Sequence, residues 1–171
     1  GASFGTATAI STITGNPIAG VACPTATSCF AVDRNGSLAA SSDGGTNWAA
    51  PFGLSGIGPN DSPNGIACAD ATHCIVVTQG PLSAIANADP SLYGSWQAPM
   101  GIPSMSFISC PSTALCVGAD QSGNVYTSTN AFTMSNWSSP SLLGGGTQGS
   151  GLTCPTVSLG EVSHRNGPLL H

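Results

Sequence analysis

Short apolar runs alternate with clusters of turn-forming residues along most of this chain. Between residues 20 and 51 the apolar runs read GVAC, CFAVD, SLAASS and WAAPF, and the segments between them read PTATS, RNG and DGGTN. Short runs bounded by glycine, proline, asparagine and aspartate predict antiparallel strands joined by tight turns. Similar runs recur at about 65–99 and 107–140, so each of these units is predicted to be a four-stranded sheet.

A cysteine pair with the spacing C-x5-C begins each unit. The first cysteines, Cys23, Cys68 and Cys110, lie about 42 to 45 residues apart, and Cys154 follows after a similar interval. A glycine, an Asx residue, a tryptophan and a proline recur in the same order after each pair: Gly36, Asp43, Trp48 and Pro51; Gly80, Asn87, Trp96 and Pro99; Gly123, Asn130, Trp137 and Pro140. A fixed period of this length indicates one supersecondary unit copied several times.

Four antiparallel strands in a repeat of about 43 residues predict an all-β fold built from β-propeller blades. The repeat region spans 1–155, with blades at about 20–51, 65–99 and 107–140 and partial blades at both ends. Residues 3–10 match the last strand of a preceding blade, and residues 151–154 match the first strand of a following one. Three whole blades are too few for a propeller, so we expect an incomplete ring or a ring completed by oligomerisation.

The repeat pattern stops after Leu159. Gly160 stands where the second cysteine of a fourth pair is expected. Residues 156–171 are therefore predicted to form an atypical tail or a C-terminal cap of the array. Cys154 is left without a partner in this pattern and is predicted to be a free thiol, which could bridge two chains.

The paired cysteines favour an oxidising compartment. Local pairing that recurs three times predicts the disulfides Cys23–Cys29, Cys68–Cys74 and Cys110–Cys116, and hence a secreted, extracellular protein. The alternative for such spacing is a metal site. Zinc sites use two such pairs with fewer intervening residues, so no metal and no cofactor are expected.

Charge excludes several classes of partner. The chain has no lysine and two arginines, and its formal net charge is −5. It offers no basic surface for phosphates, so nucleic-acid binding is not expected. An apolar run long enough to span a membrane is also missing from the sequence.

One segment carries a specific resemblance. Residues 41–48, SSDGGTNW, match S-x-D-x-G-x-x-W, and the unit resembles the Asp-box (BNR) repeats of sialidase-like β-propellers of secreted bacterial type. The resemblance covers about residues 3–155 and implies structural roles for Ser41, Asp43, Gly45 and Trp48: the aspartate caps a turn between the third and fourth strands, the glycine provides a positive φ, and the tryptophan packs into the blade. Asn87 and Asn130 replace the aspartate in the other units, which are degenerate in this respect.

The remaining candidate sites each have a structural alternative. Trp48, Trp96 and Trp137 recur once per blade and are a possible ligand platform for sugars, although packing within the blade is the favoured interpretation. Asp43 could bind a cation, but capping of its turn is favoured. His73 lies in a disulfide loop and is expected to be exposed and inert.

These features favour a non-catalytic secreted β-propeller protein that acts by binding or self-assembly. Self-association, or a protein partner that completes the sheet, is expected, and a glycan is a possible ligand. A carbohydrate-binding propeller lectin is the alternative, and a remnant of a sialidase-like glycosidase is the third possibility. Enzyme activity is not expected, because the repeats hold one arginine, and the only glutamate lies in the tail. A glycosidase needs two facing carboxylates.

Overall fold

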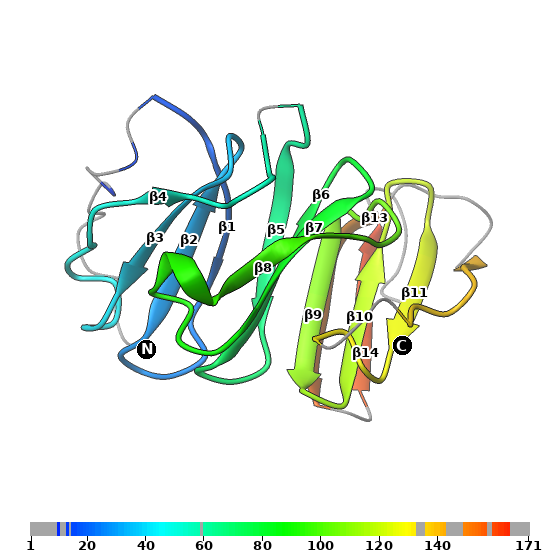
Figure 1. Ribbon diagram of the computed structural model, residues 1–171. Coiled ribbons are helices and arrows are strands. Elements are labelled where there is room, and N and C mark those ends of the chain that lie inside the picture. The colour runs from blue at the N-terminus through cyan, green and yellow to red at the C-terminus, as the bar shows by residue number, and fades with distance from the viewer. Residues whose placement is uncertain are drawn as a thin grey trace.

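The structure is a computed structural model that describes residues 10, 13, 15–58, 60–132, 136–142, 149–156 and 159–164. It is all-β, with one short 3-10 helix at Tyr93–Ser95, and no helix in these ranges is long and apolar enough to cross a membrane. Three antiparallel sheets have four strands each, in chain order within the sheet, and a two-stranded sheet follows them (Figure 1). The expectation of four-stranded repeats is therefore confirmed.

The strands follow the cysteine repeat. The first sheet comprises β1 (Ile18–Ala22), β2 (Cys29–Asp33), β3 (Ser37–Ser41) and β4 (Phe52–Gly53). The second comprises β5 (Pro63–Cys68), β6 (His73–Thr78), β7 (Leu82–Asn87) and β8 (Trp96–Gly101). The third comprises β9 (Phe107–Ser112), β10 (Leu115–Ala119), β11 (Asn124–Ser128) and β12 (Ser141–Leu142), and the last two strands are β13 (Gly149–Thr156) and β14 (Leu159–His164).

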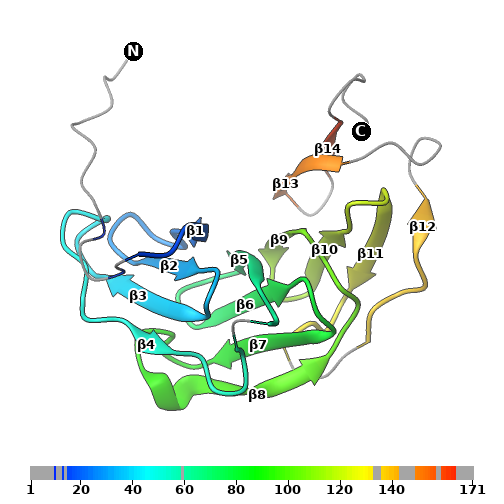
Figure 2. The same cartoon turned by 90° about the horizontal axis from the view of Figure 1, so that it is seen from above.

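The sheets stand side by side as blades along an open arc. The first strand of each sheet lies on the inner side of the arc, and β1, β5, β9 and β13 contact one another in succession (Figure 2). The described sheets do not close into a ring. The fold class is therefore the expected one, a set of β-propeller blades in an incomplete ring.

The inner strands approach closely at Gly20. A Cβ atom built on this residue would lie 2.9 Å from the backbone nitrogen of Ile66 and 3.0 Å from the Cα of Gly65. Neither backbone atom can move aside as a flexible side chain could. Glycine is therefore required at the point where β1 passes β5.

Two apolar cores lie between neighbouring sheets, and β6 contributes to both of them. Cys74 and Val76 belong to the core shared with the first sheet, whereas Ile75 and Val77 belong to the core shared with the third. All four side chains are fully buried. Successive side chains of a strand point to opposite faces, so a strand between two blades needs an unbroken apolar run, and CIVV supplies one.

The fourth strands differ from the expected positions. The run WAAPF is predicted to be the fourth strand of the first sheet, but β4 begins after Pro51, and in the third sheet β12 begins after Pro140. Before each proline, the N–H groups of Ala49 and Ser138 still donate to the carbonyls of Ala40 and Thr127, both at 2.8 Å. Proline has no N–H to donate, so the ladder is interrupted there and resumes beyond it. In the second sheet Pro99 lies inside β8, at an irregularity in the register between Ser83 and Ile85. An outermost strand tolerates this interruption.

The predictions for the two ends of the repeat region compare differently with the structure. β14 lies within the segment that was expected to be an atypical tail or cap, and it pairs antiparallel with β13, with Thr153 opposite Glu161. The tail thus adds a second strand beside Cys154 although its sequence departs from the repeat. The proposed strand at residues 3–10 lies outside the described residues, apart from Ile10.

Candidate binding site

The three predicted disulfides are confirmed. Cys23–Cys29, Cys68–Cys74 and Cys110–Cys116 each join the first two strands of a sheet. Their loops lie at one end of the blades, which is the lower end in Figure 1. They therefore close the hairpins on the same face of the molecule.

Cys154 is free, as predicted, but it is only 6% exposed. Its backbone N–H donates a 3.0 Å hydrogen bond to Ser109 Oγ on the neighbouring inner strand. Burial raises the pKa of the thiol, and the hydrogen bond with Ser109 offsets this only in part. A buried, protonated thiol is a poor nucleophile, so the idea that Cys154 bridges two chains is not supported.

Asp43 holds the turn between β3 and β4. Its Oδ1 accepts hydrogen bonds from the backbone N–H of Asn47 and the hydroxyl of Ser41, both at 2.8 Å, and Asn47 Nδ2 donates to Oδ2 at 2.6 Å. The bonds from Asn47 and Ser41 hold the pKa of Asp43 at about 2. Gly45 has a φ of 89° and donates its N–H to Ser41 Oγ. Both oxygens of the Asp43 carboxylate thus accept hydrogen bonds from residues in or next to its own turn.

The three tryptophans occupy different environments. Trp48 is half-buried, and its indole N–H donates to the carbonyl of Gly45 at 3.0 Å. Trp96 is 6% exposed within the core between the first and second sheets. Trp137 is partly buried against the other core. These rings do not form a set of equivalent open platforms, because the ring of Trp96 is covered.

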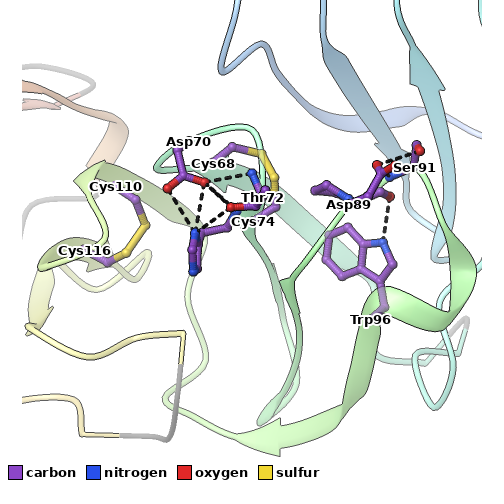
Figure 3. Close-up of a disulfide and its surroundings, with 11 residues drawn as sticks. Cys68, Asp70, Thr72, Cys74, Asp89, Ser91, Trp96, Cys110 and Cys116 are labelled. Carbon is purple, nitrogen blue, oxygen red and sulfur yellow. Dashed lines mark hydrogen bonds and ion pairs between the residues drawn. A yellow bond between two sulfur atoms is a disulfide. The ribbon is translucent and has the colours of Figure 1, made fainter.

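The turn before Trp96 uses a residue that the repeat alignment missed. Asn87 was aligned with Asp43, but its Nδ2 donates to the carbonyl of Phe132 in the next unit. Asp89 Oδ1 instead accepts hydrogen bonds from the backbone N–H and the hydroxyl of Ser91, at 2.9 and 2.7 Å (Figure 3). The sequence contains the signal for this turn, a D-x-S pattern that begins two residues after Asn87.

His73 is not the exposed, inert residue that was expected. Its side chain is 33% exposed, and Nδ1 lies 3.0 Å from both carboxylate oxygens of Asp70 (Figure 3). The ring packs edge-on against Phe132, with a centroid distance of 5.4 Å. Phe132 belongs to the core of the second and third sheets. The disulfide loop of the second blade therefore packs against the third blade.

Asp70 makes the stability of this loop depend on pH. Burial alone would raise its pKa, but the N–H and hydroxyl of Thr72 and the ring of His73 together lower it from 3.8 to about 2. Because the folded-state pKa is depressed, this contribution to stability is present above about pH 4 and is lost as the pH falls through 2.

We therefore expect Asp70→Asn to reduce stability at pH 7 and to flatten the loss of stability between pH 4 and pH 2. Urea unfolding at a series of pH values measures both effects. Thr72→Val removes one side-chain donor and keeps the backbone donors, so its effect should be smaller. Parallel pH profiles for Asp70→Asn and the parent chain would contradict the assignment.

Comparisons with known proteins identify the fold and no family. No family model matches the chain, and no curated protein matches it. Among solved structures it is similar to "YCF48 bound to D1 peptide", with 15% identity, a TM-score of 0.66 and coverage of 89% of this chain and 53% of that one.

Other structural matches agree with this fold. "Structure of U3-55K" matches with 11% identity and a TM-score of 0.68, over 90% of this chain and 48% of that one. The computationally designed Ika4 protein matches with 7% identity and a TM-score of 0.63, over 91% of this chain and 89% of that one. Such low identities show the fold alone. The chain spans about half the length of YCF48 and U3-55K.

Proposed function

We propose that this chain is a non-catalytic, secreted propeller protein whose open ring is completed by a second copy. The observation that carries the proposal is the open arc of three four-stranded sheets followed by a two-stranded sheet. In the residues that the structure describes, no third strand pairs with the outer edge of β14. Unpaired strand edges favour pairing with another chain.

The number of described blades fits a second copy. This chain covers 53% of YCF48 and 48% of U3-55K, so two arcs of this kind hold about the number of blades in such a propeller. An interface that joins one end of the arc to the other end of a second copy is heterologous, and heterologous interfaces form closed rings when the rotation closes. Two arcs would give a ring of seven or eight blades.

The inner strand of the first sheet provides an apolar surface for this contact. Ala22 packs toward the core shared with the second sheet, and Gly20 abuts β5. Strand alternation places Val21 on the opposite face, where it is 53% exposed. We expect the β13–β14 hairpin of the second copy to pack against this side.

Two further observations support the non-catalytic and secreted assignments. Asp33 and Asp43 accept hydrogen bonds from the backbone of their own turns, which leaves neither as an acid or base aimed at a substrate. The three disulfides fit an oxidising, extracellular compartment.

The hydrogen bonds of Ser41, Asp43, Gly45 and Trp48 support a relation to Asp-box propellers. A protein ligand is also compatible with the fold, since YCF48 was solved with a bound peptide.

Sedimentation velocity at micromolar concentration tests the proposal. We expect a species of twice the 16.8 kDa chain mass. Val21→Lys should shift the population toward the monomer, because the contact would bury an unpaired charge. Leu92→Lys is the matched control: Leu92 is 58% exposed and lies in the connection between β7 and β8 of the second sheet, not on β1, β13 or β14. A monomer at all concentrations, or equal effects of the two lysines, would refute self-completion.

A further inference from the structure

A polar cavity of about 360 Å³ opens between the second and third sheets. It lies at the turns that join second to third strands, and therefore at the end of the blades opposite the disulfide loops (upper end in Figure 1). Five segments line it: the β6–β7 turn, the β10–β11 turn, the connection from β8 to β9, and the strands β5 and β11 through Asn64 and Tyr126. The other polar lining residues include Gln79, Ser106, Asp120, Gln121 and Ser122.

One wall of the cavity is fixed by Asp120. Its Oδ1 accepts hydrogen bonds from the backbone N–H groups of Ser122 and Asn124, at 2.8 and 3.0 Å. Its Oδ2 accepts from Asn124 Nδ2 at 2.7 Å and from the phenol of Tyr126 at 3.2 Å. Burial alone would raise the pKa of Asp120, but these bonds outweigh it and hold the pKa below its usual range. The carboxylate therefore orders the turn and the Tyr126 ring.

The other wall is fixed by contacts across the connection between the two sheets. Asn64 Nδ2 donates to the carbonyl of Met105 at 3.1 Å, and Ser104 Oγ donates to the carbonyl of Gln79 at 2.6 Å. Met105 is buried. The backbone on both sides of the cavity is thus held in place without a ligand, which lowers the entropic cost of binding.

Several side-chain groups at the cavity have no hydrogen-bond partner among the described residues. In the described part of the chain, the carboxamides of Gln79 and Gln121 and the hydroxyls of Ser106 and Ser122 form no hydrogen bond. Each carboxamide offers two donors beside one acceptor, which matches adjacent hydroxyl groups on a ligand. The ring of Tyr126 adds an apolar surface at the same place.

Charge limits the class of ligand. None of the lining residues is basic, and Asp120 carries a negative charge, so phosphates, carboxylates and acidic sugars are disfavoured. The described residues hold no group of three or more side chains suited to a metal ion, and the available donors are amides and hydroxyls. The volume is at the small end of ligand sites, which suits one or two sugar rings.

We propose that this cavity between the second and third sheets binds a neutral saccharide. The amides of Gln79 and Gln121 hydrogen-bond to ring hydroxyls, and Tyr126 packs against the C–H face of the sugar. The site lies within a single chain, so it does not depend on completion of the ring by a second copy. It is separate from Trp48, Trp96 and Trp137, none of which lines the cavity.

Saturation-transfer NMR titration of the full chain with the methyl glycosides of glucose, galactose, mannose and N-acetylglucosamine tests the proposal. We expect saturable binding of at least one of them. The double variant Gln79→Ala/Gln121→Ala should weaken that binding by about tenfold or more, since each lost amide removes hydrogen bonds to the ligand. Both glutamines are exposed, so the variant should fold normally.

Gln97→Ala is the matched control, because Gln97 is exposed on β8 and does not line the cavity. It should bind like the parent chain. Three results would overturn the proposal: no saturable binding of any of the four glycosides, binding that the double variant leaves unchanged, or binding that is lost on Trp48→Ala instead.

Discussion

Replacing Trp96 by alanine is expected to lower the free energy of unfolding by about 3–5 kcal/mol. The side chain is 6% exposed and belongs to the core between the first and second sheets. Its indole N–H donates a 2.9 Å hydrogen bond to the carbonyl of Pro90 (Figure 3). The substitution therefore opens a cavity and leaves a buried carbonyl without its donor.

Two variants separate these effects. Trp96→Phe keeps an aromatic ring in the core and removes the donor, so it should cost about 1–3 kcal/mol. Trp48→Ala should cost less than Trp96→Ala, because Trp48 is only half-buried. Urea unfolding followed by circular dichroism avoids a signal that depends on tryptophan. Equal losses of unfolding free energy for Trp48→Ala and Trp96→Ala would show that both rings stabilise the fold to the same extent. That result would contradict the burial of Trp96.

Removing the disulfide of the second blade, with Cys68→Ala and Cys74→Ala together, is expected to cost about 2 kcal/mol from the chain entropy of the closed loop. Cys74 is also fully buried in the core of the first and second sheets, which adds a packing loss. Thermal unfolding in the absence of reductant measures the effect.

The comparison should be made in a Cys154→Ala background, because a free thiol can exchange with disulfides once the chain unfolds. Reductant should lower the melting temperature of the parent chain and should have a smaller effect on the double variant. If the double variant melted at the same temperature as its background, the loop would be held by its hydrogen bonds alone, and the disulfide would have no measurable role in stability.

Local pattern was sufficient to predict the elements whose geometry is set by nearby residues. The three disulfides and the first three strands of each blade lie where the repeat places them. Each depends on a short hairpin, in which alternation and turn residues decide the register.

The features that were missed depend on contacts distant in sequence. Asn87 reaches Phe132, 45 positions away, and the His73 ring meets the same residue. β14 pairs with β13 through backbone hydrogen bonds. This pairing does not depend on the side chains whose repeat predicts the blades. The polar cavity arises from segments of the second and third sheets that meet only after the two sheets have packed.

The assignment of successive β6 side chains to two different cores has a consequence for how the molecule comes apart. If the third sheet detaches alone, Ile75 and Val77 meet water while Cys74 and Val76 remain covered by the first sheet. Either flanking blade can therefore open without the other, but the middle blade cannot unfold unless both have lost their packing. Native-state amide exchange should then show a hierarchy of opening energies in this array, with the β6 amides exchanging only through global unfolding.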